Sequence, residues 1–463
     1  MAAVNLAAVC VFVGMSNSSA VLEEEIVIAP VPEGILSGNS GRADDRLPGW
    51  FLKRQVAAWT EFQRLPMPAR TDQAWRFSNV GALDLSSYHQ QDAPSDRDRR
   101  EILERSVALE ESAGRLVFAD DHFLERAAVS EQLHKSGVIF QTLERAMVEH
   151  EELFRRHFMS QRAILGSVKF AALHEAFVRS GVFLYVPRGV EVELPLETFH
   201  WLHAAEAAIF PHTLVVAEEM SKVTLVENFH STATGPGFAC GVNDLIVGPG
   251  AKVTYICAQD WSEQSLSIQI NSTSVARDAT ALNLHLALGG KYSRLESLSR
   301  LTGEGAHSDM LAISIGNGAR EFDARTLQDH ASPRTKSDLL FKHALADQSR
   351  STFGGLIRVE PHAHFTDAYQ KVRNLLLSDD AEANSMPGLE ILADNVKCSH
   401  GATSGQIDED EMFYLLARGI PRRVAEHLLV GGFLNEVLER LPDRKLVEKL
   451  EAQIATKFGV QST

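Results

Sequence analysis

The sequence predicts a mainly β protein, in which a solenoid of short strands lies between two helical regions. From Phe183 to about Thr403, short alternating apolar and polar segments are separated by Gly, Asn, Asp and Ser turns. So many strands exceed what one sandwich holds, whereas a coiled stack accommodates them because each turn contacts only its neighbours. On both sides of this region, apolar residues recur at helical spacing instead.

Length, charge and cysteine content limit the class of protein. A chain of 463 residues exceeds one ordinary core and predicts several domains. The formal net charge of −16 argues against nucleic acid or a membrane surface as partner. Four cysteines without a CxxC pair indicate a reducing compartment, and no segment is long and apolar enough to span a bilayer, so we expect a cytoplasmic protein.

Residues 1–45 are predicted to form a disordered N-terminal extension, because they are rich in small, polar and acidic residues. The apolar run from Ala2 to Val13 weakly resembles the core of a signal peptide. No Lys or Arg precedes Arg42, however, so the basic segment of such a peptide is missing. Met15 is therefore a plausible alternative start to Met1.

Residues 46–165 are predicted to form an N-terminal helical domain. Phe51, Val56, Trp59 and Phe62 recur at helical spacing. Charged amphipathic patterns predict further helices over 97–109 and 142–158. A helix over about 168–178 is expected to lead into the strands.

Residues 166–405 are predicted to form the solenoid core. Cys240 and Cys257 fall on separate strands and are interpreted as core residues. The clearest expected strands lie at 213–216, 222–226, 252–256, 265–270, 281–288, 310–315 and 337–341.

Residues 406–463 are predicted to form a C-terminal helical domain. Asp408 and Glu411 are typical of a capping box, and Gly419 suits the position that follows a helix. Pro421 suits the start of a second helix, which is expected to reach about Leu441. A third carries apolar residues at i, i+4 spacing. These helices are too few to bury a core alone, so they must pack on the strands or on a partner.

The common catalytic motifs are absent. The chain contains no P-loop, no HExxH and no G-x-S-x-G sequence. The carboxylate pairs Asp379-Asp380 and Asp408/Glu411 fall in predicted loops or caps. No catalytic motif of its own is therefore found in the chain, and a carbohydrate-active enzyme built on a β-solenoid and a metal-free homodimeric binding protein are the alternatives to the non-enzymatic scaffold that the family resemblance given below implies.

The tripeptide Cys398-Ser399-His400 is the main candidate metal site. In a strand, residues two apart point to the same face, so the thiol and the imidazole would lie side by side. A soft sulfur ligand beside an imidazole suits iron, zinc or an iron–sulfur cluster. Two ligands do not complete a site, and a small buried cysteine is the simpler interpretation of Cys398.

His362 and His364 are weaker candidate metal ligands. They are two residues apart and would share one face of an extended segment. Alternatively, both are turn histidines whose rings are satisfied by backbone hydrogen bonds.

Several segments resemble the SufB/SufD family, the scaffold subunits of the SUF iron–sulfur cluster assembly machinery. They are Ala74–Ser78, Pro211–Val216, Arg373–Ser378, Pro387 with Leu389–Ile391, Asn395–Thr403, Phe413–Leu415 and Arg418–Ile420. The sequence Lys-Cys-Ser-His-Gly-Ala-Thr is similar to the SufD branch. The extension before residue 45 and Gly388, where a polar residue is usual, depart from the family pattern.

This resemblance implies a right-handed parallel β-helix flanked by helical domains. It implies a complex with a SufB-like paralogue and a SufC-like ABC ATPase, docked by the C-terminal helices; a homodimer is also possible. A transient iron or iron–sulfur cluster would form at the interface with SufB, with sulfur delivered through SufB, and no cofactor would be tightly bound by this chain alone. His400 matches the SufD-side ligand proposed for the family, and Cys398 matches the cysteine beside it.

Overall fold

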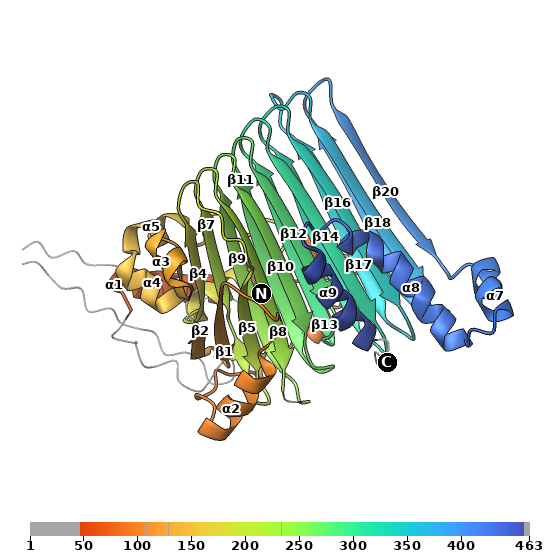
Figure 1. Cartoon of the computed structure of the whole chain (residues 1–463), viewed down its shortest axis with the longest axis horizontal. Coiled ribbons are helices and arrows are strands. Elements are labelled where there is room, and N and C mark those ends of the chain that lie inside the picture. The colour runs from red at the N-terminus through yellow and green to blue at the C-terminus, as the bar shows by residue number, and fades with distance from the viewer. Residues whose placement is uncertain (1–46, 108, 128, 233, 458–463) are drawn as a thin grey trace, which may run out of the picture. The chain divides into compact units, whose positions relative to one another are not determined.

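The computed structural model describes residues 47–457, apart from residues 108, 128 and 233. The predicted extension over 1–45 lies outside these described residues. Successive strands alternate between two sheets, so that each turn of the chain adds one strand to each sheet (Figure 1). The prediction of a mainly β solenoid with helices toward both termini is therefore confirmed.

The first sheet contains the even-numbered strands from β8 to β20, together with β1, β2 and β5. In spatial order its strands are β2 (His122–Ala127), β1 (Gly114–Ala119), β5 (Leu196–Leu202), β8 (Lys222–Ser231), β10 (Lys252–Asp260), β12 (Thr280–Ala287), β14 (His307–Gly316), β16 (Lys336–Leu345), β18 (Asp367–Leu376) and β20 (Lys397–Gly405).

The second sheet contains the odd-numbered strands from β7 to β19, together with β3, β4 and the short strand β6 (Ala208–Ile209), which pairs with β9. In spatial order its main path is β19 (Glu382–Ile391), β17 (Arg350–Val359), β15 (Glu321–His330), β13 (Tyr292–Leu301), β11 (Leu266–Val275), β9 (Phe238–Val247), β7 (His212–Ala217), β4 (Gly181–Val186) and β3 (Ile139–Thr142).

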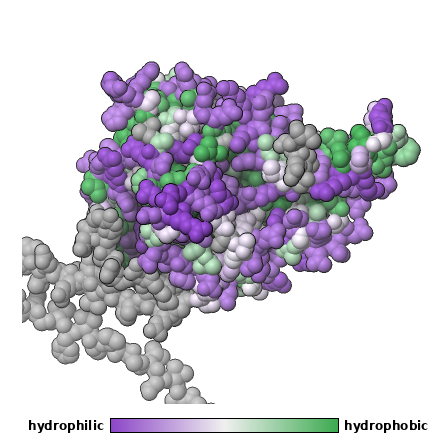
Figure 2. Space-filling view, turned by 60° about the horizontal axis from the view of Figure 1, so that its bottom comes forward, coloured by the Kyte–Doolittle hydropathy of each residue, from purple (hydrophilic) through white to green (hydrophobic). Residues whose placement is uncertain are grey.

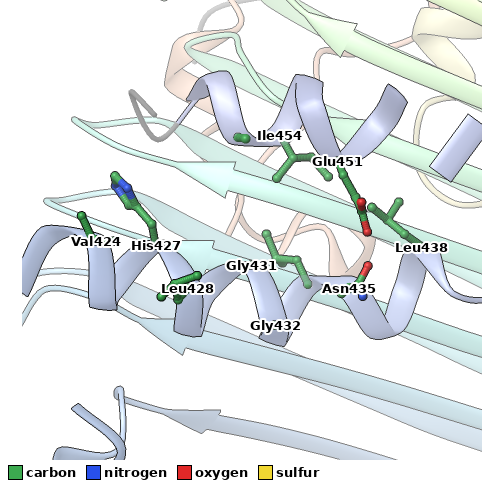
Figure 3. Close-up of a pocket in the computed structure, with 11 residues that line it drawn as sticks. Val424, His427, Leu428, Gly431, Gly432, Asn435, Leu438, Glu451 and Ile454 are labelled. Carbon is green, nitrogen blue, oxygen red and sulfur yellow. The ribbon is translucent and has the colours of Figure 1, made fainter. Parts of the chain in front are cut away.

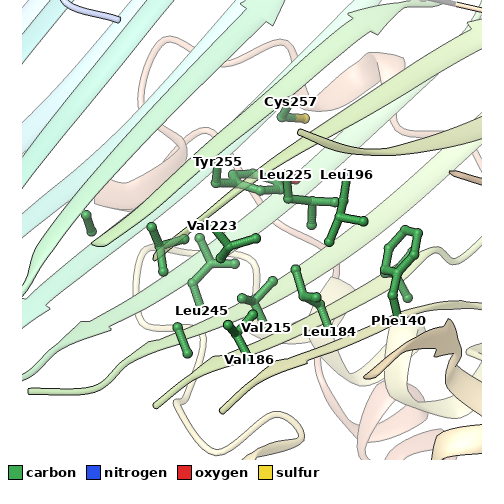
Figure 4. Close-up of a cluster of buried hydrophobic side chains, with 14 of the residues drawn as sticks. Phe140, Leu184, Val186, Leu196, Val215, Val223, Leu225, Leu245, Tyr255 and Cys257 are labelled. Carbon is green, nitrogen blue, oxygen red and sulfur yellow. The ribbon is translucent and has the colours of Figure 1, made fainter. Parts of the chain in front are cut away.

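Strands from β4 onward pair with one another in parallel along each sheet, and every second side chain points into the space between the two sheets. We call this space the interior. Near the N-terminal turns the interior is filled with aliphatic and aromatic residues (Figure 4). Strands covered on both faces carry nearly continuous buried runs, and β9 and β15 are buried along almost their whole length.

The helices before β4 pack on both sheets: most cover the outer face of the second sheet, where their apolar residues join those of β7, β9 and β11, whereas Ile102 in the helix at 96–105 packs on β1, β2 and β5 of the first sheet. They are α1 (Gly49–Arg64), the 3₁₀ turns η1 (Gln73–Trp75) and η2 (Val80–Ala82), α2 (Asp96–Arg105), α3 (Glu131–Lys135), α4 (Leu143–Glu149), α5 (Glu151–His157) and α6 (Val168–Phe177). The predictions of α1 and α6 are confirmed.

Two details of the N-terminal prediction are wrong. The single helix expected over 142–158 is two helices, because His150 leaves the helical conformation (φ −134°, ψ 41°) between α4 and α5. Its ring stacks on Phe183 with centroids 6.1 Å apart, so the break seats it against the sheet. The charged helix α2 ends at Arg105, four residues earlier than expected.

The sequence analysis did not predict strands β1, β2 and β3, which lie within the range assigned to the N-terminal helical domain. These strands are only four to six residues long, so their alternation gives too little signal. β1 pairs in parallel with β5 of the solenoid, whereas β2 and β3 pair antiparallel with β1 and β4.

The C-terminal helices are α7 (Glu409–Ala417), α8 (Arg422–Leu438) and α9 (Arg444–Lys457). Asp408 caps α7 by accepting hydrogen bonds from two backbone N–H groups, and Gly419 follows the helix at φ +80°, as predicted. α8 and α9 pack on the outer face of β12, β14 and β16, where Leu434 and Leu450 join the strand residues. The expectation that these helices need the strands is thus confirmed. Among the described helices, none is long and apolar enough to cross a membrane.

Candidate functional site at the open end of the solenoid

The two ends of the strand stack differ. At the N-terminal end, antiparallel strands β2 and β3 form the last strand of each sheet. At the other end, β20 pairs with β18 and β19 pairs with β17, and no further described strand covers their outer edges (Figure 1). No residue of β19 or β20 is fully buried, in contrast to the inner strands. Such an uncovered edge presents free backbone groups to a second chain.

β20 carries both main candidate ligands on one face. Cys398 is the ladder partner of Ala368, and His400 is the ladder partner of Gln370. Because Ala368 and Gln370 are fully buried on the interior face of β18, Cys398 and His400 occupy the interior face of β20. Their Cα atoms are about 7 Å apart along the strand. This face of β20 points toward the interior, but His400 is exposed because no strand follows β20 among the described residues.

Cys398 is half-buried beside Val396, Ala393 and the buried Ala368. Burial and the negative charge of Asp367 raise the pKa of the thiol, and the backbone of Ala368 partly opposes this. Lys397 lies on the opposite face of the strand. The thiol is therefore protonated at neutral pH in the chain by itself, and it becomes a thiolate ligand only when a metal displaces the proton.

His362 and His364 lie in the turn between β17 and β18. The Nε2–H of His362 donates to the carbonyl oxygen of Ala331 at 3.0 Å, and the Nδ1–H of His364 donates to that of Asp394 at 3.1 Å. Each ring thus ties its turn to a neighbouring turn. These contacts fit the turn-histidine interpretation.

Within the part of the chain that the structure describes, no three His, Cys, Asp or Glu side chains come together as a group that could hold a metal ion. Cys240 and Cys257 are fully buried in the strand stack, and burial raises the pKa of both thiols. Cys398 and His400 are therefore the cysteine–histidine pair that reaches the surface at the open end.

A second surface lies on the C-terminal helices. Phe413 and Tyr414 of α7 are 70% and 55% exposed, and Val424 and Leu428 of α8 are also exposed. Apolar side chains gather toward this part of the molecule in Figure 2. Beside them, an apolar groove of about 430 Å³ runs between α8 and α9 (Figure 3). We call α7 with this groove the helical docking surface.

Sequence reasoning quoted Phe413 and Tyr414 but missed that both are exposed. The sequence gives no clear signal for this, because adjacent residues of a helix can both lie within one apolar stripe, as the buried Val437 and Leu438 of α8 do. Leu389 and Ile391 of β19 and the following Leu392 are also exposed, which the sequence analysis did not predict.

The structure is thus an open-ended β-solenoid whose terminal strand carries a cysteine and a histidine on one face. Residues 200–433 match the family described as "SUF system FeS cluster assembly, SufBD core domain", and residues 50–198 match the "SufBD protein N-terminal region". The chain belongs to the SufB/SufD family of iron–sulfur cluster assembly proteins.

Curated relatives agree with this family. The chain is 29% identical over 418 residues to "Iron-sulfur cluster assembly protein SufD" of Bacillus subtilis (strain 168), which covers 89% of this chain and 94% of the relative. It is 26% identical to SufB of the same organism, over 87% of this chain and 88% of the relative. An iron–sulfur cluster assembly SufBD family protein of Staphylococcus epidermidis is also 26% identical, with the same coverage. The chain is therefore more similar to the Bacillus SufD than to the Bacillus SufB.

Proposed function

We propose that this chain is a SufD-like scaffold subunit, which contributes His400 and Cys398 to an iron–sulfur cluster assembled across an interface with a SufB-like partner. The observation that carries the proposal is the position of β20. It is the uncovered terminal strand of its sheet, and it presents an imidazole and a thiol at the open end of the interior. The nascent cluster is cargo, and the remaining ligands come from the partner.

The edges of β19 and β20 support a solenoid-to-solenoid interface. Leu389, Ile391 and Leu392 expose apolar area beside unpaired backbone groups. A second chain would cover the apolar area and complete the backbone hydrogen bonds at the same time. A homodimer would use the same edge, so the composition of the purified complex distinguishes the two partners.

The test is His400→Ala in the complex reconstituted with SufB-like and SufC-like partners. We expect iron and sulfide content to fall about tenfold, while co-purification of the subunits is unchanged. Ser399→Ala is the matched control, because Ser399 is exposed on the opposite face of the same strand. Full cluster yield from His400→Ala would overturn the assignment of this residue.

We further propose that the helical docking surface binds the SufC-like ATPase. Phe413 and Tyr414 would insert into a hydrophobic pocket of the ATPase, because large exposed aromatic residues are typical anchors of protein interfaces. We expect the double substitution Phe413→Ser/Tyr414→Ser to abolish co-purification with the ATPase. Deletion from Asp408 onward should do the same, whereas Arg444→Ser, at an exposed position of α9, should not. Retention of the ATPase by the double variant would exclude this surface.

Contacts between α8 and the first sheet give a route by which ATPase movement reaches β20. The buried Lys342 of β16 donates to the carbonyl oxygen of Phe433 and pairs with Glu436 at 2.5 Å. Arg373 of β18 pairs with the same carboxylate at 3.2 Å. Because β18 is the hydrogen-bonded neighbour of β20, displacement of α8 would be transmitted to the strand that carries His400. In this role the chain couples mechanical motion to assembly and needs no catalytic step of its own.

A further inference from the structure

Gln370 has an unusual environment for a buried side chain. It lies on the interior face of β18 and is 0% exposed. Neither its Nε2 nor its Oε1 has a hydrogen-bond partner among the described residues. A buried amide whose donor and acceptor are both unpaired destabilises the folded state, because both groups lose their hydrogen bonds to water. Such a group therefore requires an explanation.

The surroundings hold this amide in place. A Cβ atom at Gly355, on the facing strand β17, would overlap the Nε2 of Gln370 and the ring of Phe353. The side chain of Gln370 thus reaches across the interior into a space that only glycine leaves open. Other interior glutamines make at least one hydrogen bond: Gln269 donates to Asn271 at 2.9 Å, and Gln328 donates to Ser337 at 2.7 Å although its Oε1 is unpaired.

The ladder partner of Gln370 is His400. Partners on adjacent parallel strands have Cα atoms about 4.8 Å apart, and both of these side chains lie on the interior face. Gln370 is therefore the fully buried polar residue next to His400 in the ladder, although no hydrogen bond joins the two side chains in this structure.

We propose that Gln370 is a positioning residue for His400: once the exposed ring turns inward over β18, the Oε1 of Gln370, which is unpaired in this structure, accepts a hydrogen bond from one ring N–H and leaves the lone pair of the other nitrogen directed at the open end. Histidine ligands generally donate their second ring N–H to a nearby acceptor, which fixes the tautomer and the ring orientation. The proposal rests on the proposed function of His400. It adds that the acceptor which orients the ligand is supplied by this chain and not by the partner.

The experiment compares the full chain with Gln370→Met and Gln370→Glu. In protein labelled with ¹⁵N-histidine at one constant pH, the ring nitrogen shifts report the tautomer, and His400→Ala assigns the resonances. We expect one tautomer in the original chain, a mixture in Gln370→Met, and one tautomer again in Gln370→Glu, which retains an acceptor. Gln269→Met, a buried interior glutamine remote from β20, should leave the His400 tautomer unchanged.

Two further measurements separate positioning from a merely structural role. The urea midpoint of Gln370→Met should stay the same or rise, because an unpaired amide is replaced by an apolar side chain of similar length. Its cluster yield in the reconstituted complex should nevertheless fall about tenfold, and Gln370→Glu should recover most of it.

The results distinguish failure of the positioning role of Gln370 from failure of the proposed ligand role of His400. If His400→Ala lowers cluster yield but Gln370→Met changes neither tautomer nor yield, the positioning role is wrong and the ligand role stands. If Gln370→Met changes the tautomer but His400→Ala leaves the yield intact, the pair exists and the proposed function fails. A fall in the urea midpoint of Gln370→Met together with an unchanged tautomer overturns positioning in favour of packing.

Discussion

His343 is expected to make the fold sensitive to mild acid, and the size of this effect follows from its burial. The side chain lies in the interior from β16 and is 1% exposed, and neither ring nitrogen has a hydrogen-bond partner among the described residues. Burial lowers the pKa of His343 from 6.5 to about 4. Between these two pH values the unfolded chain binds more protons than the folded chain, so stability is complete above pH 6.5 and is lost as the pH falls toward 4.

The magnitude can be worked out for one pH interval. Between pH 7.5 and pH 5.0, protonation of this one residue in the unfolded chain lowers the free energy of unfolding by about 2 kcal/mol. Other groups titrate in the same interval, including Asp244, whose pKa burial raises to about 7 and whose contribution has the opposite sign. When the stability change of one variant between the two pH values is subtracted from that of the original chain, the contributions of all other titrating groups cancel.

The assay is urea unfolding of the full chain followed by tryptophan fluorescence at pH 7.5 and pH 5.0. His343→Leu should lose about 2 kcal/mol less stability over this interval than the original chain. Phe341→Leu is the matched control, because Phe341 faces the same interior from the same strand and does not titrate; it should lower stability equally at both pH values. If His343→Leu and the original chain lose the same stability within about 0.5 kcal/mol, the ring is not held neutral by burial and the reasoning fails.

Two further predictions concern the packing and the helix contact. Gly355→Ala should lower the free energy of unfolding by about 1–3 kcal/mol because its Cβ overlaps Gln370 and Phe353, and Gln370→Ala should recover part of this loss in the double variant. Equal losses with and without Gln370→Ala would show that the glutamine does not occupy this space. Glu436→Gln should lower stability by about 1–2 kcal/mol, because Lys342 and Arg373 lose their shared carboxylate. Differential urea unfolding measures both effects, and an unchanged midpoint for Glu436→Gln would exclude the coupling of α8 to the sheet through this residue.

The sequence alone determined the fold class and the order of the main elements. Short β-prone segments predicted the strands, because each segment is bounded by the Gly, Asn, Asp or Ser residues of a turn. The caps of α7 were readable because capping depends on residues close in sequence, namely Asp408 and Gly419. The shared face of Cys398 and His400 followed from the two-residue period of a strand.

The repeat itself was hidden because the turns differ in length. Leu266 pairs with Tyr292, 26 residues further along, whereas Asp367 pairs with Lys397, 30 residues further along. A solenoid with variable turns has no fixed sequence period, so the ladder partner of any residue cannot be counted from the sequence. The pairing of Gln370 with His400 and the space at Gly355 therefore emerged only from the strand register.

Tertiary structure also decided which strands are terminal. The segment of β20 contains no Val, Leu, Ile or aromatic residue, unlike β16 and β18, but only the strand register shows that no described strand lies beyond it. The antiparallel strands β2 and β3, at the opposite edges, were too short to be recognised and acquire their place from long-range pairing. Local pattern fixes periodicity and caps because these depend on near neighbours, whereas the open end, with Cys398 and His400 on its terminal strand, depends on contacts between residues far apart in the chain.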